Sequence, residues 1–206
     1  MEKFNNLPAE KQKAIIDAAL VSFGTNGYKK TSANDIAAAA GISKAMVFHY
    51  FGTKKAMYFY LLDLCGTIIV NEVKEKFDNS ITDFFERIRL SSDIEISVMR
   101  KHPAILSFLK SAYFENDEEV KADIKALLEK GEGEDFRNKI AFEGVDFSKF
   151  KEGIDLKLIT KILYWIADGF ASNFSNKTMD DFEAFCKDFD DCINLFKNNF
   201  YKEEYL

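Results

Sequence analysis

Proline occurs at only two positions in this chain of 206 residues, Pro8 and Pro103. Because proline is the strongest helix breaker, almost the whole sequence is free to form long helices. Apolar residues recur at three- and four-residue spacing in most segments, which is the period of one helix face, and no strand pattern or internal repeat stands out. The sequence therefore predicts an all-α fold with about nine helices.

Start and stop signals divide the chain into these helices. Ser32 and Asp35 have the spacing of a capping box, Gly41 provides a turn, and Ser43 and Thr53 are suited to cap the helices that follow them. Further starts are expected at Ser80-Ile-Thr-Asp83, at Pro103 and at Thr178. We expect helices over residues 9–24 (stopped by Gly24 and Gly27), 33–40, 44–50, 54–78, 81–101, 103–114, 117–141 with an interruption near Gly131 and Gly133, 155–173 and 179–202.

The charge is unevenly distributed along the chain. The formal net charge is −6, yet residues 1–60 hold eight lysines and only four acidic residues, whereas residues 61–206 hold 20 basic and 30 acidic ones. Such asymmetry suggests a basic binding module joined to an acidic body, although many solvated surfaces are equally lopsided.

Other features restrict the class of protein. Cys65, Cys186 and Cys192 are odd in number and have no metal-ligand spacing, so we expect reduced, buried thiols in a reducing compartment. No signal-peptide pattern is present, and apolar stretches such as Tyr58–Leu62 are far shorter than the ~18 residues of a membrane span. These observations predict a cytoplasmic, soluble protein.

Neither histidine suggests a metal or catalytic site. His49 and His102 have no nearby partner at a recognisable ligand spacing, and no Ser/His/Asp set or glycine-rich phosphate loop is present. The sequence predicts no enzyme activity, no cofactor and no metal. A role for His102 in ligand gating is the less favoured alternative to a helix-end residue.

The most specific pattern lies between Ala33 and Tyr50. Counted from Ala33, a helix-turn-helix window requires apolar residues at positions 4, 8, 10, 15 and 18, a small residue at 5 and glycine at 9, because two steeply crossing helices meet at a tight turn. The sequence supplies Ile36, Ala40, Ile42, Val47, Tyr50, Ala37 and Gly41. The alternative is a coincidental short helical hairpin.

These residues, together with Gly27-Tyr28, Thr31-Ser32, Ser43-Lys44, Phe48–Phe51 and Lys54, resemble the DNA-binding domain of TetR-type transcriptional regulators. The resemblance covers about residues 9–65. It implies a helix-turn-helix DNA-binding domain over residues 1–53, a helical ligand-binding and dimerisation domain over residues 54–206, and a homodimer that a small ligand usually releases from DNA.

The resemblance and the geometry of the motif suggest which residues meet DNA. The second helix enters the major groove, where Lys44, Ala45 and Phe48, next to Ser43, face the base edges, although Lys44 suits a phosphate almost equally well. The resemblance places Thr31, Ser32, His49, Tyr50 and Lys54 near phosphates. Met46 and Gly52 depart from the family pattern, because a hydroxyl and a charged residue are frequent there.

Two further sets of residues are expected in the body. A two-fold dimer interface is predicted from the apolar stripes of the last two helices, with intramolecular core as the alternative. Its candidates are Ile162, Ile166, Phe170, Phe185, Phe189 and Phe196, and the same stripes continue to Phe174. Candidates for lining a pocket for a hydrophobic or aromatic ligand are Tyr60, Phe108, Tyr113, Phe114, Phe136 and Trp165, each of which also fits plain core.

The function predicted is that of a sequence-specific, DNA-binding transcriptional regulator. We expect a ligand-released repressor that acts as a homodimer on a pseudo-palindromic operator. The alternatives are a helical carrier or enzyme that binds a small molecule and does not use its N-terminal module for DNA, and a protein–protein adaptor.

Overall fold

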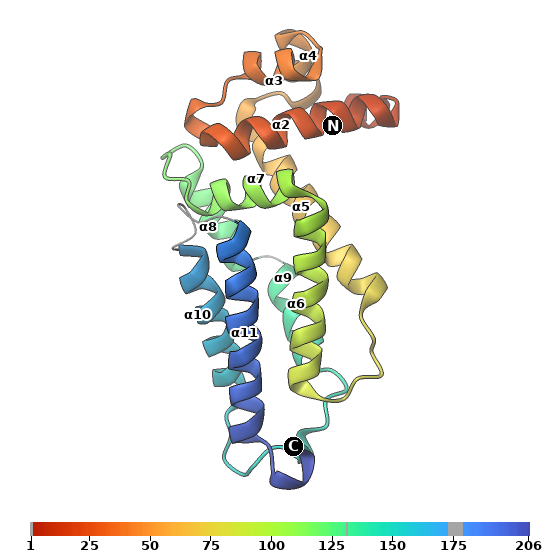
Figure 1. Ribbon diagram of the computed structural model, residues 1–206. Coiled ribbons are helices and arrows are strands. Elements are labelled where there is room, and N and C mark those ends of the chain that lie inside the picture. Colours follow the sequence, from red (N-terminus) through yellow and green to blue (C-terminus); the bar gives the residue numbers. More distant parts are fainter. Residues whose placement is uncertain (1, 131, 173–178) are drawn as a thin grey trace. The chain divides into compact units, whose positions relative to one another are not determined.

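The computed structural model describes residues 2–130, 132–172 and 179–206, and over these residues it contains helices and no β-strand. The all-α prediction is confirmed, with eleven α-helices in the described residues rather than about nine. They are α1 (Glu2–Asn5), α2 (Ala9–Lys30), α3 (Ala33–Ala40), α4 (Lys44–Phe51), α5 (Lys54–Lys76), α6 (Phe84–Lys101), α7 (Pro103–Tyr113), α8 (Lys121–Lys130), α9 (Glu132–Phe142), α10 (Leu156–Ser172) and α11 (Met179–Phe200) (Figure 1). Short 3₁₀ helices span Phe147–Lys149 and Glu203–Tyr205.

Most of the predicted helix starts are confirmed. The Ser32 hydroxyl accepts a hydrogen bond from the Asp35 N–H (3.2 Å), and the Asp35 carboxylate accepts one from the Ser32 N–H (2.9 Å), which completes the capping box. Ser43 and Thr53 cap α4 and α5 through the amides three residues on. Pro103 occupies the first turn of α7, where its missing N–H costs no intrahelical bond.

Three predicted boundaries are wrong. The helix predicted from residue 117 begins at Lys121, after a turn over residues 118–120. The helix predicted to start after Ser80 begins at Phe84, because Asp83 accepts the hydrogen bonds from the amides of Phe85 and Glu86 (both 3.1 Å). The first helix does not stop at Gly24. Helical structure continues to Lys30, interrupted at Gly27, which has φ 72°.

Other differences concern elements at the margins of the predictions. Helix α1 has no counterpart among the predicted elements, because four residues are too few to display a period. The interruption expected near Gly131, the cap expected at Thr178 and the stripe residue Phe174 lie outside the described residues.

The chain divides into two compact units. The first comprises residues 1–72 and 97–131, and the second comprises residues 73–96 and 132–206. Helices α5 and α6 each contribute residues to both units. The predicted division at residue 53, between a DNA-binding domain and a ligand-binding and dimerisation domain, concerns function and not these compact units, and it stays a prediction.

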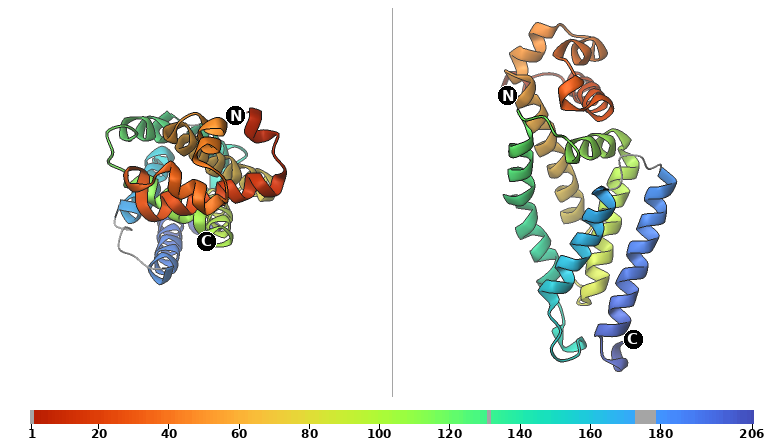
Figure 2. Two further views of the ribbon diagram at one scale, coloured as in Figure 1. Left: turned by 90° about the horizontal axis from the view of Figure 1, so that it is seen from above. Right: turned by 90° about the vertical axis from the view of Figure 1, so that its left-hand side faces the viewer.

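In the first unit, α2 lies alongside α7 (Figures 1 and 2). The approach is close at Gly24, where an added Cβ would lie 2.8 Å from the Ser107 Oγ and 3.1 Å from the Phe108 N. This explains the glycine inside a helix, since only a residue without a side chain permits such contact between helices. The Ser111 hydroxyl adds a hydrogen bond to the Phe23 carbonyl (3.0 Å).

Helix α5 provides much of the core of the first unit. Its side chains Met57, Tyr58, Leu61 and Cys65 are completely buried. Of the described helices, only Lys54–Lys76 is long and apolar enough to cross a membrane by length and composition. One such helix is by itself weak evidence for a membrane span, and several of its apolar side chains lie in this core.

The second unit is held together by aromatic packing and by one buried cation. Phe84, Phe85, Phe150 and Tyr201 form a ring cluster with centroid separations of 4.7–5.9 Å. The buried Arg87 guanidinium donates to the carbonyls of Ile81 and Ile140 (both 2.7 Å) and lies 4.7 Å from the ring centroid of Phe77. Its N–H groups thus satisfy one backbone acceptor near the end of α9 and one in the segment that precedes α6.

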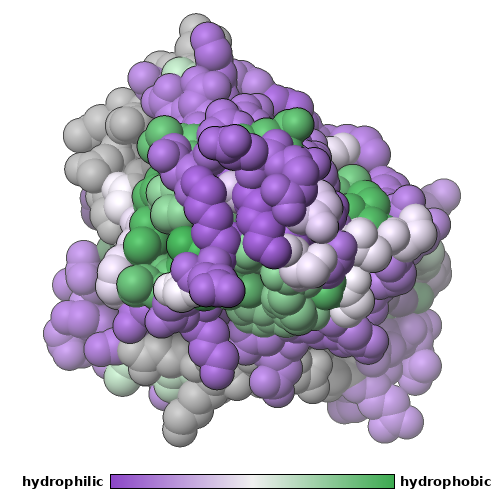
Figure 3. Space-filling model, turned by 90° about the horizontal axis from the view of Figure 1, so that it is seen from below, coloured by the Kyte–Doolittle hydropathy of each residue, from purple (hydrophilic) through white to green (hydrophobic). Residues whose placement is uncertain are grey.

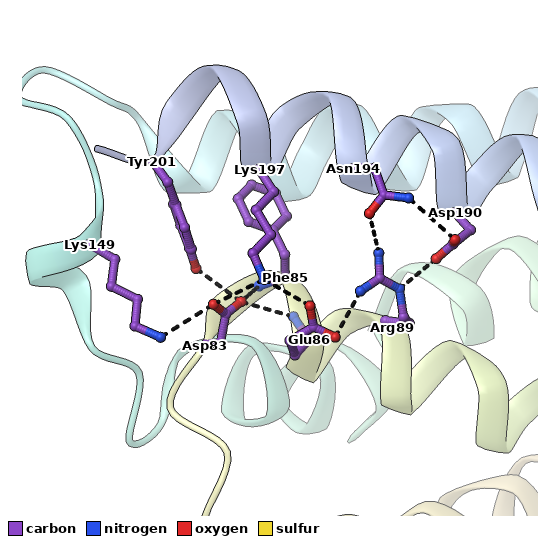
Figure 4. A network of polar contacts seen from close by, with 9 residues as sticks. All are labelled: Asp83, Phe85, Glu86, Arg89, Lys149, Asp190, Asn194, Lys197 and Tyr201. Carbon is purple, nitrogen blue, oxygen red and sulfur yellow. Dashed lines mark hydrogen bonds and ion pairs between the residues drawn. The ribbon is translucent and has the colours of Figure 1, made fainter. Parts of the chain in front are cut away.

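A polar network joins the start of α6 to α11 in this unit (Figure 4). Asp83 accepts hydrogen bonds from the Lys149 ammonium (3.3 Å) and the Tyr201 hydroxyl (3.1 Å), and it pairs with Lys197 (3.3 Å). Lys197 also bonds Glu86 (2.8 Å). Arg89 continues the network from Glu86 to Asp190 and Asn194 on α11.

The face of the molecule in Figure 3 is mostly hydrophilic, with hydrophobic residues reaching the surface near its middle.

Candidate DNA interface

Helices α3 and α4 form a helix-turn-helix whose inward residues are those of the predicted window. Ile36, Ala37, Val47 and Tyr50 are buried, and Ala40 and Ile42 are half-buried. Gly41 adopts a left-handed conformation (φ 67°), which glycine reaches at no steric cost. The window residues therefore pack as the motif requires.

The opposite face of α4 is exposed. Lys44, Ala45, Phe48 and His49 all face solvent, and Phe48 is 40% exposed although it is a large apolar side chain. The Lys44 ammonium lies 6.0 Å from the Phe48 ring centroid. A cation, a methyl group and an aromatic ring at the start of a helix match the chemistry of a guanine edge and of a thymine methyl group.

Ser43 and Met46 lie next to this exposed face, and their contacts help to fix the first turn of α4. The Ser43 hydroxyl oxygen accepts the Met46 N–H (3.3 Å), so its own proton is free to donate. Met46 is half-buried and packs on the core of the first unit. This explains the departure from the family pattern, because the thioether here fills a core position.

Four of the five residues expected near phosphates, all except Lys54, lie in different environments. Ser32 and His49 are exposed, and the Ser32 hydroxyl also donates to the Asp35 carboxylate (2.7 Å). These hydrogen bonds hold the pKa of Asp35 below its usual range. Thr31 is only 1% exposed, and its hydroxyl lies 2.7 Å from the Gly27 carbonyl and 2.9 Å from the Ser22 carbonyl. Tyr50 is buried in the core.

The side chains of Thr31 and Tyr50 are mostly buried, and their predicted contacts with phosphate stay predictions. The Thr31 hydroxyl bonds backbone inside the α2–α3 turn, and the Tyr50 ring packs against other rings. Only a small part of either side chain is exposed. Their contribution is to the shape of the motif.

Lys54 is also held by the protein. Its ammonium donates to the carbonyls of Tyr28 (2.9 Å) and Thr31 (3.2 Å), and it lies 4.0 Å from the centroid of the Tyr28 ring. Two of its three protons are therefore directed at the carbonyls around the α2–α3 turn, and the predicted contact of Lys54 with phosphate stays a prediction.

Two supporting contacts were missed in the sequence. The fully buried Phe4 packs against rings at the end of α4, and the Glu115 carboxylate accepts a hydrogen bond from the Tyr28 N–H (2.6 Å). Both join residues distant in sequence, so no local pattern could reveal them. Burial raises the pKa of the Tyr28 and Tyr58 hydroxyls in this core.

The dimer candidates that the structure describes are all half-buried. These are Ile162, Ile166, Phe185, Phe189 and Phe196, whereas the side chain of Phe170 lies outside the described part. The same helices also expose large apolar side chains, with Trp165 and Tyr164 both 53% exposed and Leu158 and Leu195 close to half. Helices α10 and α11 thus carry more apolar surface than their own unit covers.

Four of the six pocket candidates belong to the first unit, and Phe136 and Trp165 belong to the second. Phe108 is fully buried in the core of the first unit and Tyr60 packs against that core, whereas Phe136 packs in a small cluster of the second unit. Tyr113 and Trp165 are exposed. The remaining candidate, Phe114, is half-buried beside Tyr113. Which of them meet a ligand stays a prediction.

Comparison with known proteins adds to this geometry. Residues 15–61 match the family described as bacterial regulatory proteins, tetR family. The HTH-type transcriptional regulator BetI of Agrobacterium fabrum is 43% identical over 87 residues, which is 42% of this chain and 41% of BetI. The match therefore spans about two fifths of that relative's length.

Two solved structures share the fold over most of the chain. FadR from Bacillus subtilis in complex with stearoyl-CoA is 19% identical, with a TM-score of 0.68 over 90% of this chain and 96% of that one. SmeT, the repressor of a Stenotrophomonas maltophilia multidrug efflux pump, was solved with triclosan. That complex is 14% identical, with a TM-score of 0.73 over 94% of this chain and 93% of the other.

Proposed function

We propose that this chain, whose residues 15–61 match the tetR family of bacterial regulatory proteins, is a ligand-released transcriptional repressor of that family that binds its operator as a homodimer. The observation that carries the proposal is the exposed face of α4. Lys44, Ala45 and Phe48 stand on a helix whose other face is buried, so the protein presents base-reading chemistry on a rigid support.

The charge distribution supports a duplex as the partner. Residues 1–60 carry a positive balance, whereas the remainder of the chain is acidic. A basic head attracts phosphates, and an acidic body disfavours contact with DNA elsewhere. The binding affinity is therefore expected to fall steeply with salt.

We place the dimer contact on α10 and α11. Their exposed Leu158, Trp165 and Leu195 and half-buried Ile162 and Phe189 offer an apolar surface that a second copy would cover. An isologous contact of this kind would present two reading heads to one face of DNA. Spacing of about 34–36 Å between them would match successive major grooves of a pseudo-palindrome.

We assign ligand binding to the helical body, residues 54–206, and DNA binding to residues 1–53. The body is rich in phenylalanine, which favours a hydrophobic or aromatic ligand. FadR and SmeT, which share the fold, were solved with stearoyl-CoA and triclosan, both of which have large apolar parts. Release of DNA requires only that the ligand prefer one of two arrangements, typically by about 1–3 kcal/mol. The protein would act in the cytoplasm, where its operator is.

Selection from random duplex DNA tests the proposal. The full-length protein is expected to enrich a pseudo-palindromic sequence, to bind it with an affinity that falls steeply with salt, and to sediment as a dimer. A monomer that retains no duplex at low ionic strength would contradict the proposal. It would favour the helical small-molecule-binding protein that does not use its N-terminal module for DNA.

A further inference from the structure

Residues 2–7, which precede α2 in the chain, comprise the short helix α1 and the two residues that follow it. Helix α1 ends at Asn5, and the Gln12 side chain on α2 donates to the carbonyls of Asn5 (3.1 Å) and Leu7 (2.8 Å). Leu7 packs partly buried against the core of the first unit. These contacts hold a segment that is too short to form a stable helix alone.

Phe4 connects this segment to α4, which we call the recognition helix because it carries the residues proposed to face the base edges. Its side chain is completely buried, and its ring centroid lies 4.8 Å from that of Phe51, 6.0 Å from that of Tyr50 and 5.7 Å from that of Tyr60. Phe51 and Tyr50 form the last turn of α4, and Tyr60 belongs to α5. Phe4 therefore fills the space where the recognition helix ends and the next helix runs past it.

The position of α4 depends on such packing. With eight residues it has about two turns, and helices of that length are not stable by themselves. Its N-terminus is fixed by the Ser43 cap and by Gly41, so Phe4 supports the other end. A change in the tilt of α4 would move Lys44 and Phe48 relative to a base edge, and specific contacts tolerate only about 0.5 Å of displacement.

We propose that α1 is a latch for the recognition helix, in which Phe4 is a positioning residue that sets sequence discrimination without touching DNA. The part of this inference that concerns DNA binding rests on the proposed function, whereas the support of α4 by Phe4 does not. Loss of the latch would weaken binding to the operator more than binding to unrelated duplex, because phosphate contacts depend on charge and tolerate reorientation better than base contacts do.

The test uses the full-length protein and two duplexes, one recovered by selection with the parent and one with the same bases scrambled. Phe4→Ala is expected to lower affinity for the selected duplex about tenfold or more and affinity for the scrambled duplex less than about threefold, with an unchanged salt slope. Phe4→Leu, which keeps the apolar volume, should fall between the parent and Phe4→Ala, and it serves as the main variant if Phe4→Ala does not fold.

Two control variants distinguish a latch from a general loss of stability and from the loss of a nearby charge. Phe150→Ala removes another buried phenylalanine that contacts three rings, Phe84, Phe85 and Tyr201, in the second unit. It should leave the ratio of the two affinities as in the parent. Lys3→Ala removes the exposed cation of α1, and because a lost charge acts on all duplexes alike, it should also leave the ratio of the two affinities as in the parent. If either control reproduces the effect of Phe4→Ala, the latch is overturned.

Hydrogen exchange of the DNA-free protein gives a second readout. Phe4→Ala should raise the exchange rate of the α4 amides about tenfold, whereas Phe150→Ala should not. Unchanged exchange in α4 together with an unchanged affinity ratio would overturn the latch. If the parent retains no duplex, the proposed function fails, and the latch is judged on the exchange of α4.

Discussion

The Lys54 ammonium donates to the carbonyl of Tyr28 at 2.9 Å and lies over the ring of the same residue, 4.0 Å from its centroid. One side chain at the start of α5 thereby holds both the backbone and the aromatic ring of the α2–α3 turn. The Tyr28 amide also donates a hydrogen bond to the Glu115 carboxylate, and Glu115 lies two residues beyond the end of α7. Residues far apart in sequence therefore support the helix-turn-helix of α3 and α4.

Removal of the Lys54 charge should act mainly on stability. Lys54→Met keeps most of the stem but leaves the Tyr28 and Thr31 carbonyls without their donor, which should lower the free energy of unfolding by about 1–2 kcal/mol. Urea denaturation measures this change. A parent-like stability combined with a salt slope of DNA binding reduced by about 1 would instead show that Lys54 acts on a phosphate.

Lys44 should contribute to base selection. Its ammonium is exposed at the first turn of α4, so Lys44→Ala should cost about 1–3 kcal/mol on the selected duplex and relax the preference at one base pair. Repeating the duplex selection with the variant shows which position loses its preference. A uniform loss on all sequences, with a smaller salt slope, would assign Lys44 to the DNA backbone.

The network around Asp83 should make stability fall at acidic pH. Burial by itself would raise the pKa of Asp83, but the Glu86 amide, Lys197 and Lys149 outweigh it and hold the pKa below its usual range. Because the unfolded chain then binds more protons, this contribution is complete above about pH 5 and is lost as the pH falls through about 4 toward the lower folded pKa.

Asp83→Asn measures the size of that contribution. Its partners are about one-fifth exposed, between the limits of a surface pair and a buried pair, so the loss at pH 7 should be about 2 kcal/mol. The difference from the parent should shrink toward pH 3. Asp17→Asn, which breaks the exposed pair with Lys13, is the control and should cost less than about 0.5 kcal/mol. Equal losses for the two variants would contradict the role given to the network.

Two helical glycines should respond in opposite directions. Gly24→Ala would force α2 and α7 apart, because its Cβ would meet Ser107 and the backbone of Phe108, and should cost about 1–3 kcal/mol. Gly66 on α5 has no atom within 4 Å of an added Cβ. Gly66→Ala should therefore stabilise by about 0.5–1 kcal/mol, as expected for alanine in a helix. Thermal unfolding of both variants tests the pair, and a neutral Gly24→Ala would refute the close approach.

Features that depend on neighbours in the chain were predictable. The Ser32–Asp35 capping box, the caps at Ser43 and Thr53 and the left-handed Gly41 all follow from residues within three or four positions. The pattern of apolar residues around them correctly predicted which side of α3 and α4 is buried. The resemblance to a family with the same motif came from this short stretch.

Tertiary packing decided the placements that those patterns could not. Thr31 and Lys54 have polar side chains suited to phosphate, but the Thr31 hydroxyl bonds carbonyls of α2, and Lys54 bonds the carbonyls of residues 26 and 23 positions before it. Phe4 carries no periodic signal and becomes part of the core only because α4 and α5 meet around it. Capping and helix period are properties of a few consecutive residues, whereas burial and hydrogen-bond partners depend on which distant segments the fold brings together.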